Sequence, residues 1–172
     1  MPVTRRTVDL SAYPDLVVIY LGMRVNRPAG LRTLLGFGPR ITDAVGRRPD
    51  GLLMHENLLF SLIPPHAGMR QYWRDFEALE RWARSEPHRR WWQAYLRETG
   101  GTGFWHETYF MRGGVEAIYD EMPRPLGLSA FAPTLAPRGA MFSARRRLGL
   151  ESEGGLAPAL AEDDLYDGRP SS

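Results

Sequence analysis

The sequence has 172 residues, 43% of them hydrophobic, and a formal net charge of +2 at pH 7. This length predicts one domain with one core, and the small net charge, without a basic stripe interleaved with aromatic residues, does not indicate nucleic-acid binding. All 22 basic residues are arginine and cysteine is absent, which excludes Schiff-base chemistry on lysine, a phosphate-binding lysine, a thiol nucleophile and a cysteine metal site.

The sequence does not indicate a membrane-bound or secreted protein. No segment approaches the about 20 consecutive apolar residues that cross a bilayer. The N-terminus lacks the basic region, apolar core and small-residue cleavage site of a signal peptide. We therefore expect a soluble cytoplasmic protein, with neither nucleic acid nor a membrane among its partners.

Composition divides the chain into four parts. Residues 1–14 carry few strand or helix signals and are predicted to form an N-terminal arm. Residues 15–123 contain the periodic segments and are predicted to form the folded domain. Residues 124–150, rich in proline and glycine, are predicted to be a loop-rich extension. Residues 151–172 combine six acidic residues with glycine, proline and serine, so we expect this tail to be disordered.

The first part of the predicted domain contains a strand and a helical region. Residues 15–23 are rich in branched and aromatic side chains, as is typical of a central strand. The sequence Asn-Arg-Pro at 26–28 then indicates the start of a helix. Apolar residues follow at helical spacing, but two glycines and a proline within 36–39 interrupt them. We therefore expect two shorter helical pieces rather than one long helix.

A hairpin and a helix are predicted next. Residues 51–60 and 69–76 have the composition of strands, and the segment 63–68, with two prolines, is predicted to be the turn that joins them. Asp75 is a candidate N-cap for the following helix, which Pro87 ends or kinks.

Three further elements complete the domain. Residues 88–99 are predicted to be helical, 104–110 to form a fourth strand, and 115–122 to form a fifth strand at the sheet edge. The core order is then β-α-β-β-α-β, a ferredoxin-like split unit of the α+β class. Because this topology leaves one sheet face uncovered, and a second copy commonly covers it, we expect a homodimer.

The fourth strand carries a histidine and a glutamate within the sequence GFWHETYF (103–110). Strand alternation places His106 on one face with Phe104, and Glu107 on the other face with Tyr109. His106 is a candidate general acid–base, and a hydrogen-bonded core histidine is the alternative. A weaker copy of the motif, MHENL, lies on the second predicted strand.

Glu107 would need a partner or a shifted pKa if the strand were buried. Arg24, Arg70 and Arg74 lie on neighbouring strands or at their ends, and each could pair with it. We include Arg24 and Glu107 among the candidate catalytic residues, as groups that would orient His106. A structural glutamate–arginine pair is the alternative.

Aromatic residues are candidates to line an apolar substrate pocket, although most such residues usually fill cores. The tryptophans concerned are Trp73, Trp82, Trp91, Trp92 and Trp105. We predict that Trp73, Phe104 and Tyr109 form the substrate pocket.

Four segments together resemble the DUF4188 family: VIYLGMRVNR (18–27), MRQYWRDFEALERWAR (69–84), FWHETYF (104–110) and EAIYDEMP (116–123). The resemblance spans about residues 15–130. Because that family is grouped with antibiotic-biosynthesis monooxygenase-like proteins, the resemblance implies a monooxygenase-like dimeric α+β barrel.

A second resemblance is to the haem-containing aldoxime dehydratases, and it rests on WARSEPH (82–88) and FWHE (104–107). It implies that His88 is the axial ligand of haem iron, that Trp92 contacts the cofactor, and that His106 is the distal acid–base residue. The other catalytic arginine and serine of those enzymes have no matching position here. From the residues alone, an exposed capping histidine is the alternative for His88.

Together these features favour a small-molecule enzyme that acts on an apolar or aromatic substrate, with haem or with no cofactor. It would be a monooxygenase-like oxidoreductase or a haem-dependent lyase. One alternative is a cofactor-independent cyclase or isomerase that uses His106 and Glu107 for proton transfer. Another is a non-catalytic ligand-binding dimer, in which these two residues are structural.

Overall fold

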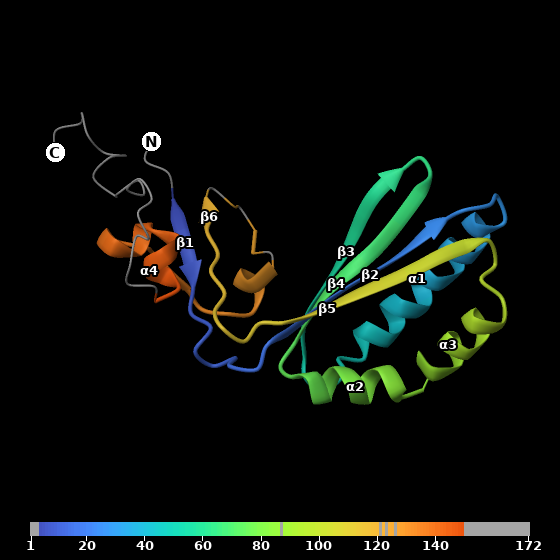
Figure 1. The fold of residues 1–172 in the computed structure, drawn as a ribbon, viewed down its shortest axis with the longest axis horizontal. Helices are drawn as coiled ribbons and strands as arrows, with labels where there is room; N and C mark the ends of the chain where they lie inside the picture. The colour runs from blue at the N-terminus through green and yellow to red at the C-terminus, as the bar shows by residue number, and fades with distance from the viewer. Residues whose placement is uncertain (1–3, 87, 121, 123, 126, 150–172) are drawn as a thin grey trace. The chain divides into compact units, whose positions relative to one another are not determined.

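The computed structural model describes residues 4–86, 88–120, 122, 124–125 and 127–149. The chain divides into two units, of which one is Tyr13–Arg112 and the other is built from the described residues on either side of it (Figure 1). Each unit has a β-sheet of its own.

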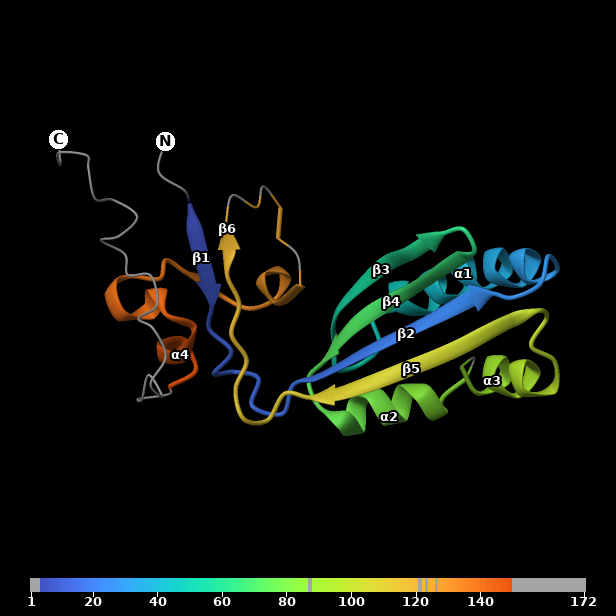
Figure 2. The same ribbon diagram turned by 45° about the horizontal axis from the view of Figure 1, so that its top comes forward.

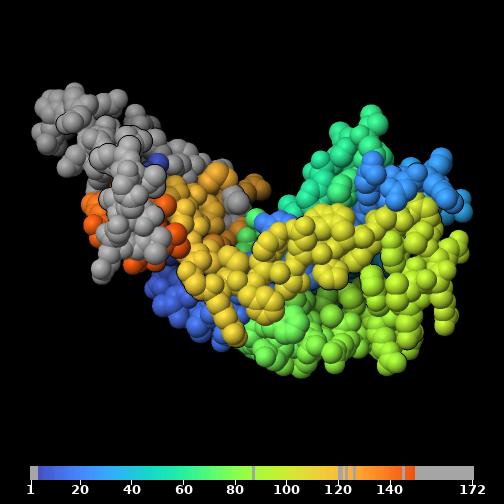
Figure 3. Space-filling model, in the orientation of Figure 1, coloured from blue at the N-terminus to red at the C-terminus, as the bar shows by residue number. Residues whose placement is uncertain are grey.

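The first unit contains a four-stranded antiparallel sheet. Its strands are β2 (Val17–Val25), β3 (Leu52–Leu62), β4 (Pro65–Trp73) and β5 (Thr102–Phe110). They lie in the order β3-β4-β2-β5, and each neighbouring pair is antiparallel. β5 forms one edge of the sheet and lies at the surface (Figure 3). This order is that of a ferredoxin-like split unit, so the predicted α+β fold is confirmed.

Three helices lie on one face of this sheet (Figures 1 and 2). α1 (Gly30–Gly46) connects β2 to β3, whereas α2 (Phe76–Arg84) and α3 (His88–Arg97) lie between β4 and β5 in the chain. The helix-side face of the sheet is therefore where a core can form. That core consists of Val17, Trp73, Ala78 and Leu79.

The region after β2 is one helix, so the prediction of two shorter helical pieces is wrong. α1 runs for 17 residues with Pro39 inside it. Pro39 has no N–H to donate to the preceding turn, but Gly30 and Ala44, near the two ends, are buried, and this packing outweighs the local cost. A Cβ atom on Gly30 would lie 2.4 Å from the carbonyl oxygen of Gly101, so the helix can begin beside that loop only with glycine.

The hairpin is tighter than predicted. The turn predicted over 63–68 is present but covers only residues 63–64, because β4 begins at Pro65, which pairs with Leu62. β4 ends at Trp73, so residues 74–76, which were predicted to be strand, instead lead into α2. The prolines hid the strand signal, but the first residue of a strand is a position where a missing N–H is tolerated.

The second unit contains a small sheet in the order β6-β1-β7. Its strands are β1 (Arg5–Val8), β6 (Tyr119–Asp120) and β7 (Thr134–Leu135). The predicted N-terminal arm thus contains a central strand. Among the described residues of the predicted strand 115–122, only 119–120 are paired, and they pair with β1 rather than with the edge of the larger sheet. Local patterns could not show this pairing, since its two strands lie at opposite ends of the domain sequence.

Short helices and a buried arginine complete the second unit. The helices are η1 (Gly127–Ala130), η2 (Gly139–Phe142) and α4 (Ala144–Arg147). The guanidinium of Arg147 lies 2.8 Å from Oε2 of Glu116 and donates to the carbonyl oxygens of Met141 and Phe142. One arginine of the cluster at 145–147 is therefore structural. The predicted tail, 151–172, lies outside the described residues, and within those described no helix is long and apolar enough to span a membrane.

Asp75 is the N-cap of α2, as predicted, since its Oδ1 accepts the backbone N–H of Ala78 at 2.7 Å. We expect Asp75→Ala to lower the free energy of unfolding by about 1 kcal/mol, because the first turn of α2 loses an acceptor. Urea denaturation measures the change. Asp75→Asn retains an acceptor oxygen and should recover most of the stability; an equal loss in both variants would contradict the capping role.

Candidate active site

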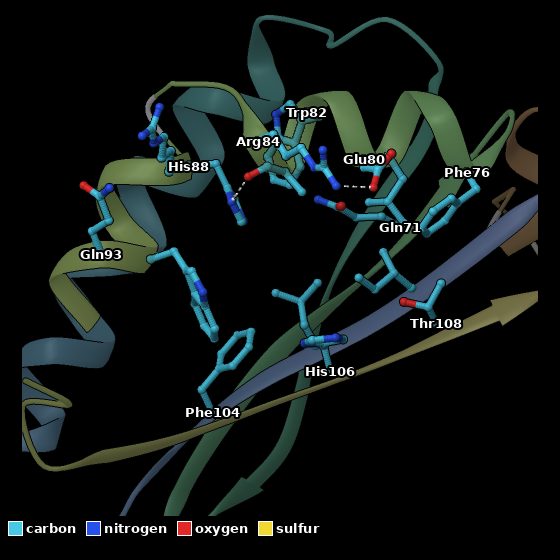
Figure 4. A pocket seen from close by; sticks show the side chains of 16 residues that line it. Gln71, Phe76, Glu80, Trp82, Arg84, His88, Gln93, Phe104, His106 and Thr108 are labelled. Atoms are coloured by element: carbon cyan, nitrogen blue, oxygen red, sulfur yellow. Dashed lines mark hydrogen bonds and ion pairs between the residues drawn. The ribbon is translucent and has the colours of Figure 1, made fainter. Parts of the chain in front are cut away.

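A cavity of about 680 Å³ lies between the sheet and helices α2 and α3 (Figure 4). Strands β2, β4 and β5 line one side of it, and the two helices line the other. Its volume is within the range of about 300–1,000 Å³ that is typical of ligand pockets. Most of the lining is apolar, and the imidazoles of His88 and His106 reach it from opposite sides.

The break between α2 and α3 positions His88. α2 ends at Arg84, and both the backbone N–H and the hydroxyl of Ser85 donate back to the carbonyl of Trp82. α3 then begins at His88, whose ring lies 4.8 Å from the ring of Trp82, centroid to centroid. The imidazole extends into the cavity from the start of α3 (Figure 4). It is half-buried there, not exposed as the alternative of a capping histidine supposed.

A single hydrogen bond determines the tautomer of His88. Its Nδ1 lies 2.8 Å from the carbonyl oxygen of Ala83, and because a carbonyl can only accept, Nδ1 carries the proton. Ala83 belongs to the last turn of α2, where carbonyls have no partner within the helix. Burial lowers the pKa of His88, which favours the neutral ring. Nε2 is then left with a lone pair that is free to bind a ligand.

His106 lies on β5, on the face that lines the cavity. Phe104 and Thr108 line the same cavity, as strand alternation predicts. The ring of His106 lies 6.0 Å from that of Phe104, and the residue is exposed through the open side of the cavity. The structure therefore brings His106 and His88 to one site from different elements.

Glu107 points to the opposite face of the sheet, where its carboxylate accepts a hydrogen bond from Tyr109. It is exposed rather than buried, because β5 is an edge strand. The predicted arginine partners are wrong. Arg24 donates to Asn26, Arg70 pairs with Glu56, and Arg74 pairs with Asp50 and Asp75.

The structure separates the other predicted site residues into two groups. Trp92 and Phe104 line the cavity, with ring centroids 5.3 Å apart. Trp73 is fully buried in the core, Tyr109 lies on the opposite face with Glu107, and Arg24 lies at the end of β2; none of the three lines the cavity. The prediction that Trp73 and Tyr109 form the substrate pocket is therefore corrected. A large aromatic residue on the helix side can equally fill the core.

A second cavity of about 570 Å³ lies between the sheet, α1 and α3. It shares the side chains of His88, Trp92 and Phe104 with the first cavity. Its α1 wall includes Phe37 and Ile41, which sequence reasoning did not connect with a site. Their helical spacing indicated only an apolar face, and which element covers that face depends on the tertiary fold.

Gln71 is a further cavity residue that sequence reasoning missed. It lies on β4 and borders the first cavity, and it is fully buried (0% exposed). A signal was present, since Gln71 alternates with Met69 and Trp73 and so places a polar side chain on an otherwise apolar strand face.

The sequence of this chain matches a known protein family. The sequence profile of a family described as "Monooxygenase af470-like" matches residues 16–128. A search of the curated proteins finds no significant match.

Two solved structures of aldoxime dehydratases resemble the fold. One has a TM-score of 0.61 at 24% sequence identity and covers 77% of this chain and 39% of its own. The other, OxdRE in complex with butyraldoxime, has a TM-score of 0.67 at 22% identity and covers 86% of this chain and 43% of its own. The cofactor-independent oxygenase SnoaB from Streptomyces nogalater has a TM-score of 0.43 at 14% identity, and covers 58% and 96%. This chain thus spans less than half the length of the two dehydratases.

The burial of His88 makes the stability of the fold dependent on pH. Its pKa in the folded state is below the ordinary value of about 6.5, so the unfolded chain takes up this proton at a higher pH than the folded chain. This contribution to stability is complete above about pH 6.5 and is lost as the pH falls toward the lowered pKa. We expect His88→Gln to reduce the fall in Tm between about pH 7.5 and about pH 5.

Gln93→Ala is the matched control, because Gln93 is another cavity residue of α3 and carries no titrating group. It should show the same pH dependence as the wild type. A pH dependence that is unchanged in His88→Gln would contradict the burial of a neutral His88.

Proposed function

The chain belongs to the Monooxygenase af470-like family, and we propose that it is a small-molecule enzyme that binds haem in the cavity between its sheet and helices α2 and α3. The substrate is an apolar or aromatic molecule, in keeping with the apolar lining. The two histidines of the cavity have separate roles. His88 ligates the iron, and His106 gives or takes a proton.

The observation that carries the proposal is the state of His88. A neutral imidazole whose Nδ1–H donates to a backbone carbonyl presents Nε2 as a metal ligand, and the hydrogen bond also orients the ring. Within the described part of the chain, no three His, Asp or Glu side chains are grouped to hold a metal ion. This donor set suits a metal that brings most of its ligands with it, as haem iron does.

The surrounding residues also suit a large planar group. Trp82, Trp92 and Phe104 offer aromatic faces to the cavity. Arg89, on the helical side, is a cation that can pair with a carboxylate of haem, whereas Arg84 pairs with Glu80. The cofactor would supply an iron that binds a small polar group of the substrate.

His106 supplies the proton chemistry in this proposal. Imidazole is the side chain that most readily exchanges a proton near neutral pH. Its position on β5, across the cavity from His88, leaves room for a substrate between the two (Figure 4). The open side of the cavity gives His106 access to solvent for the return of the proton.

Two comparisons support the same pair of residues. The segments WARSEPH and FWHE resemble those of haem-containing aldoxime dehydratases, and they contain His88 and His106. The fold of two aldoxime dehydratases, one of them in complex with butyraldoxime, resembles this one. The resemblance concerns the fold, and the reaction that this chain catalyses is part of our proposal.

We also propose that the sheet face without helices packs against a second copy of the chain. Arg70 on this face is half-buried, donates to Glu56 and to the hydroxyl of Tyr20, and lies over the rings of Tyr20 and Tyr72. Such ordered charged and aromatic side chains are typical of interface centres. The matched dehydratases are more than twice as long as the segment they share with this chain, which leaves room for a second such unit within one of their chains.

We expect titration of the full chain with hemin to give a saturable Soret band with one hemin per chain. His88→Ala should weaken binding at least about tenfold, because the iron loses its ligand, and added imidazole should restore the spectrum. Absorption spectroscopy measures both effects.

His106→Ala and His66→Ala are the matched controls for hemin binding. His106 lines the same cavity from β5, so its substitution should leave one hemin bound while turnover is lost. His66 accepts a hydrogen bond from Trp105 on the other sheet face, so its substitution should change neither hemin binding nor turnover. The absence of a saturable band, or a band that is unaffected in His88→Ala, would overturn the haem assignment.

We expect light scattering after size exclusion to give twice the chain mass of 19.5 kDa. Tyr109→Asp, on the sheet face without helices, should give a monomer with unchanged circular dichroism, since it buries a charge in the interface. Leu96→Asp, at an exposed residue of α3, is the control and should remain dimeric. A wild-type monomer at micromolar concentration would contradict this interface.

A further inference from the structure

Gln71 is held by hydrogen bonds at both ends of its side-chain amide. Its Oε1 lies 3.1 Å from the indole Nε1 of Trp73, and its Nε2 lies 3.2 Å from Nδ1 of His55. Indole N–H can only donate, so the oxygen of the amide must face Trp73. The orientation of the amide follows without ambiguity, and its N–H groups point away from Trp73.

The chain of hydrogen bonds continues in one direction. Gln71 donates to Nδ1 of His55, so the proton of this imidazole lies on Nε2, which donates to Oδ1 of Asn57 at 3.1 Å. Burial lowers the pKa of His55 and keeps it neutral, as this arrangement requires. Trp73, Gln71, His55 and Asn57 thus form one line of donors across the helix-side face of β3 and β4.

One N–H of Gln71 has only a weak partner. The amide nitrogen has two N–H groups, of which one donates to His55, and the other acceptor within reach is the sulfur of Met69 at 3.7 Å. A thioether sulfur is a weak acceptor. The fully buried N–H would therefore form a stronger hydrogen bond if an oxygen atom replaced the sulfur of Met69 as its acceptor. Gln71 borders the cavity, whose lining is mostly apolar but also includes the Arg84–Glu80 ion pair (Figure 4).

We propose that Gln71 is the polar anchor of the cavity and donates its amide N–H to a single neutral acceptor, such as a carbonyl oxygen, on an otherwise apolar or aromatic substrate. The inference rests on the proposed function, because it names the substrate class of the same cavity. A neutral acceptor is favoured over a carboxylate, since the two arginines that line this cavity, Arg84 and Arg89, lie on its helical side, Arg84 already pairs with Glu80, and a buried charge without a cation is costly. Trp73 and His55 act through Gln71, as positioning residues.

Acetophenone and ethylbenzene test the anchor, because they have similar size and differ in one carbonyl oxygen. Calorimetric titration of the full chain as purified should show acetophenone binding about tenfold more tightly than ethylbenzene. In Gln71→Met, which has a similar volume and no N–H, the two affinities should become equal. Gln93→Met is the matched control at a second glutamine of the cavity and should keep the preference.

A second variant guards against misfolding, since Gln71→Met leaves Trp73 and His55 without their partner. Gln71→Glu keeps an acceptor for Trp73, and the single O–H of its buried, protonated carboxyl donates to Nδ1 of His55 in place of the amide, so no donor is left for the probe. It should also lose the preference while circular dichroism stays unchanged. The proposal is overturned if the wild type binds neither probe, binds both equally, or if the preference survives in both variants.

The hemin titration separates this result from the proposed cofactor. A carbonyl preference that depends on Gln71, in a protein that binds no hemin, would overturn the haem assignment alone. Hemin binding that depends on His88, without the carbonyl preference, would overturn the role of Gln71 alone.

Discussion

The alternation of side chains along β-strands is the constraint on which the candidate site depends. It gives the four-stranded sheet one face that packs under the helices and one that does not. His106 and Glu107, neighbours in the chain, therefore lie on opposite sides, and the carboxylate of Glu107 accepts from Tyr109 instead. A partner for His106 in the proposed site therefore has to come from the helices on the other side of the cavity. His88 is the candidate that the helices provide.

The protonation of His88 and the orientation of the Gln71 amide are each fixed by one hydrogen-bond partner. The carbonyl of Ala83 can only accept, so it holds the proton of His88 on Nδ1. The indole of Trp73 can only donate, so it holds the oxygen of Gln71 toward itself. A free lone pair and an N–H with a weak partner thus border one cavity. In the proposed function, the lone pair would bind the iron and the N–H would bind a polar atom of the substrate.

The candidate site was only partly predictable. His88, Phe104 and His106 were singled out within two short segments and Trp92 in the predicted helix between them, and all four line the cavity. The resemblance to haem-containing aldoxime dehydratases singled out His88 and His106, and their spacing fits it because a helix followed by an antiparallel strand returns the chain across the same sheet face. Gln71 was missed because a single polar residue on an apolar strand face does not by itself show which residues it contacts. Its role depends on partners from β3, whose register with β4 is set by the whole hairpin.

The sequence by itself determined the order of strands and helices in the first unit, the cap at Asp75 and the opposite faces of His106 and Glu107, because each depends on a local period or a short-range hydrogen bond. Only the tertiary structure decided that α1 continues through Pro39, that Trp73 fills the core and that β6 pairs with β1. These outcomes depend on burial and pairing between segments far apart in the chain, and local pattern carries no information about either.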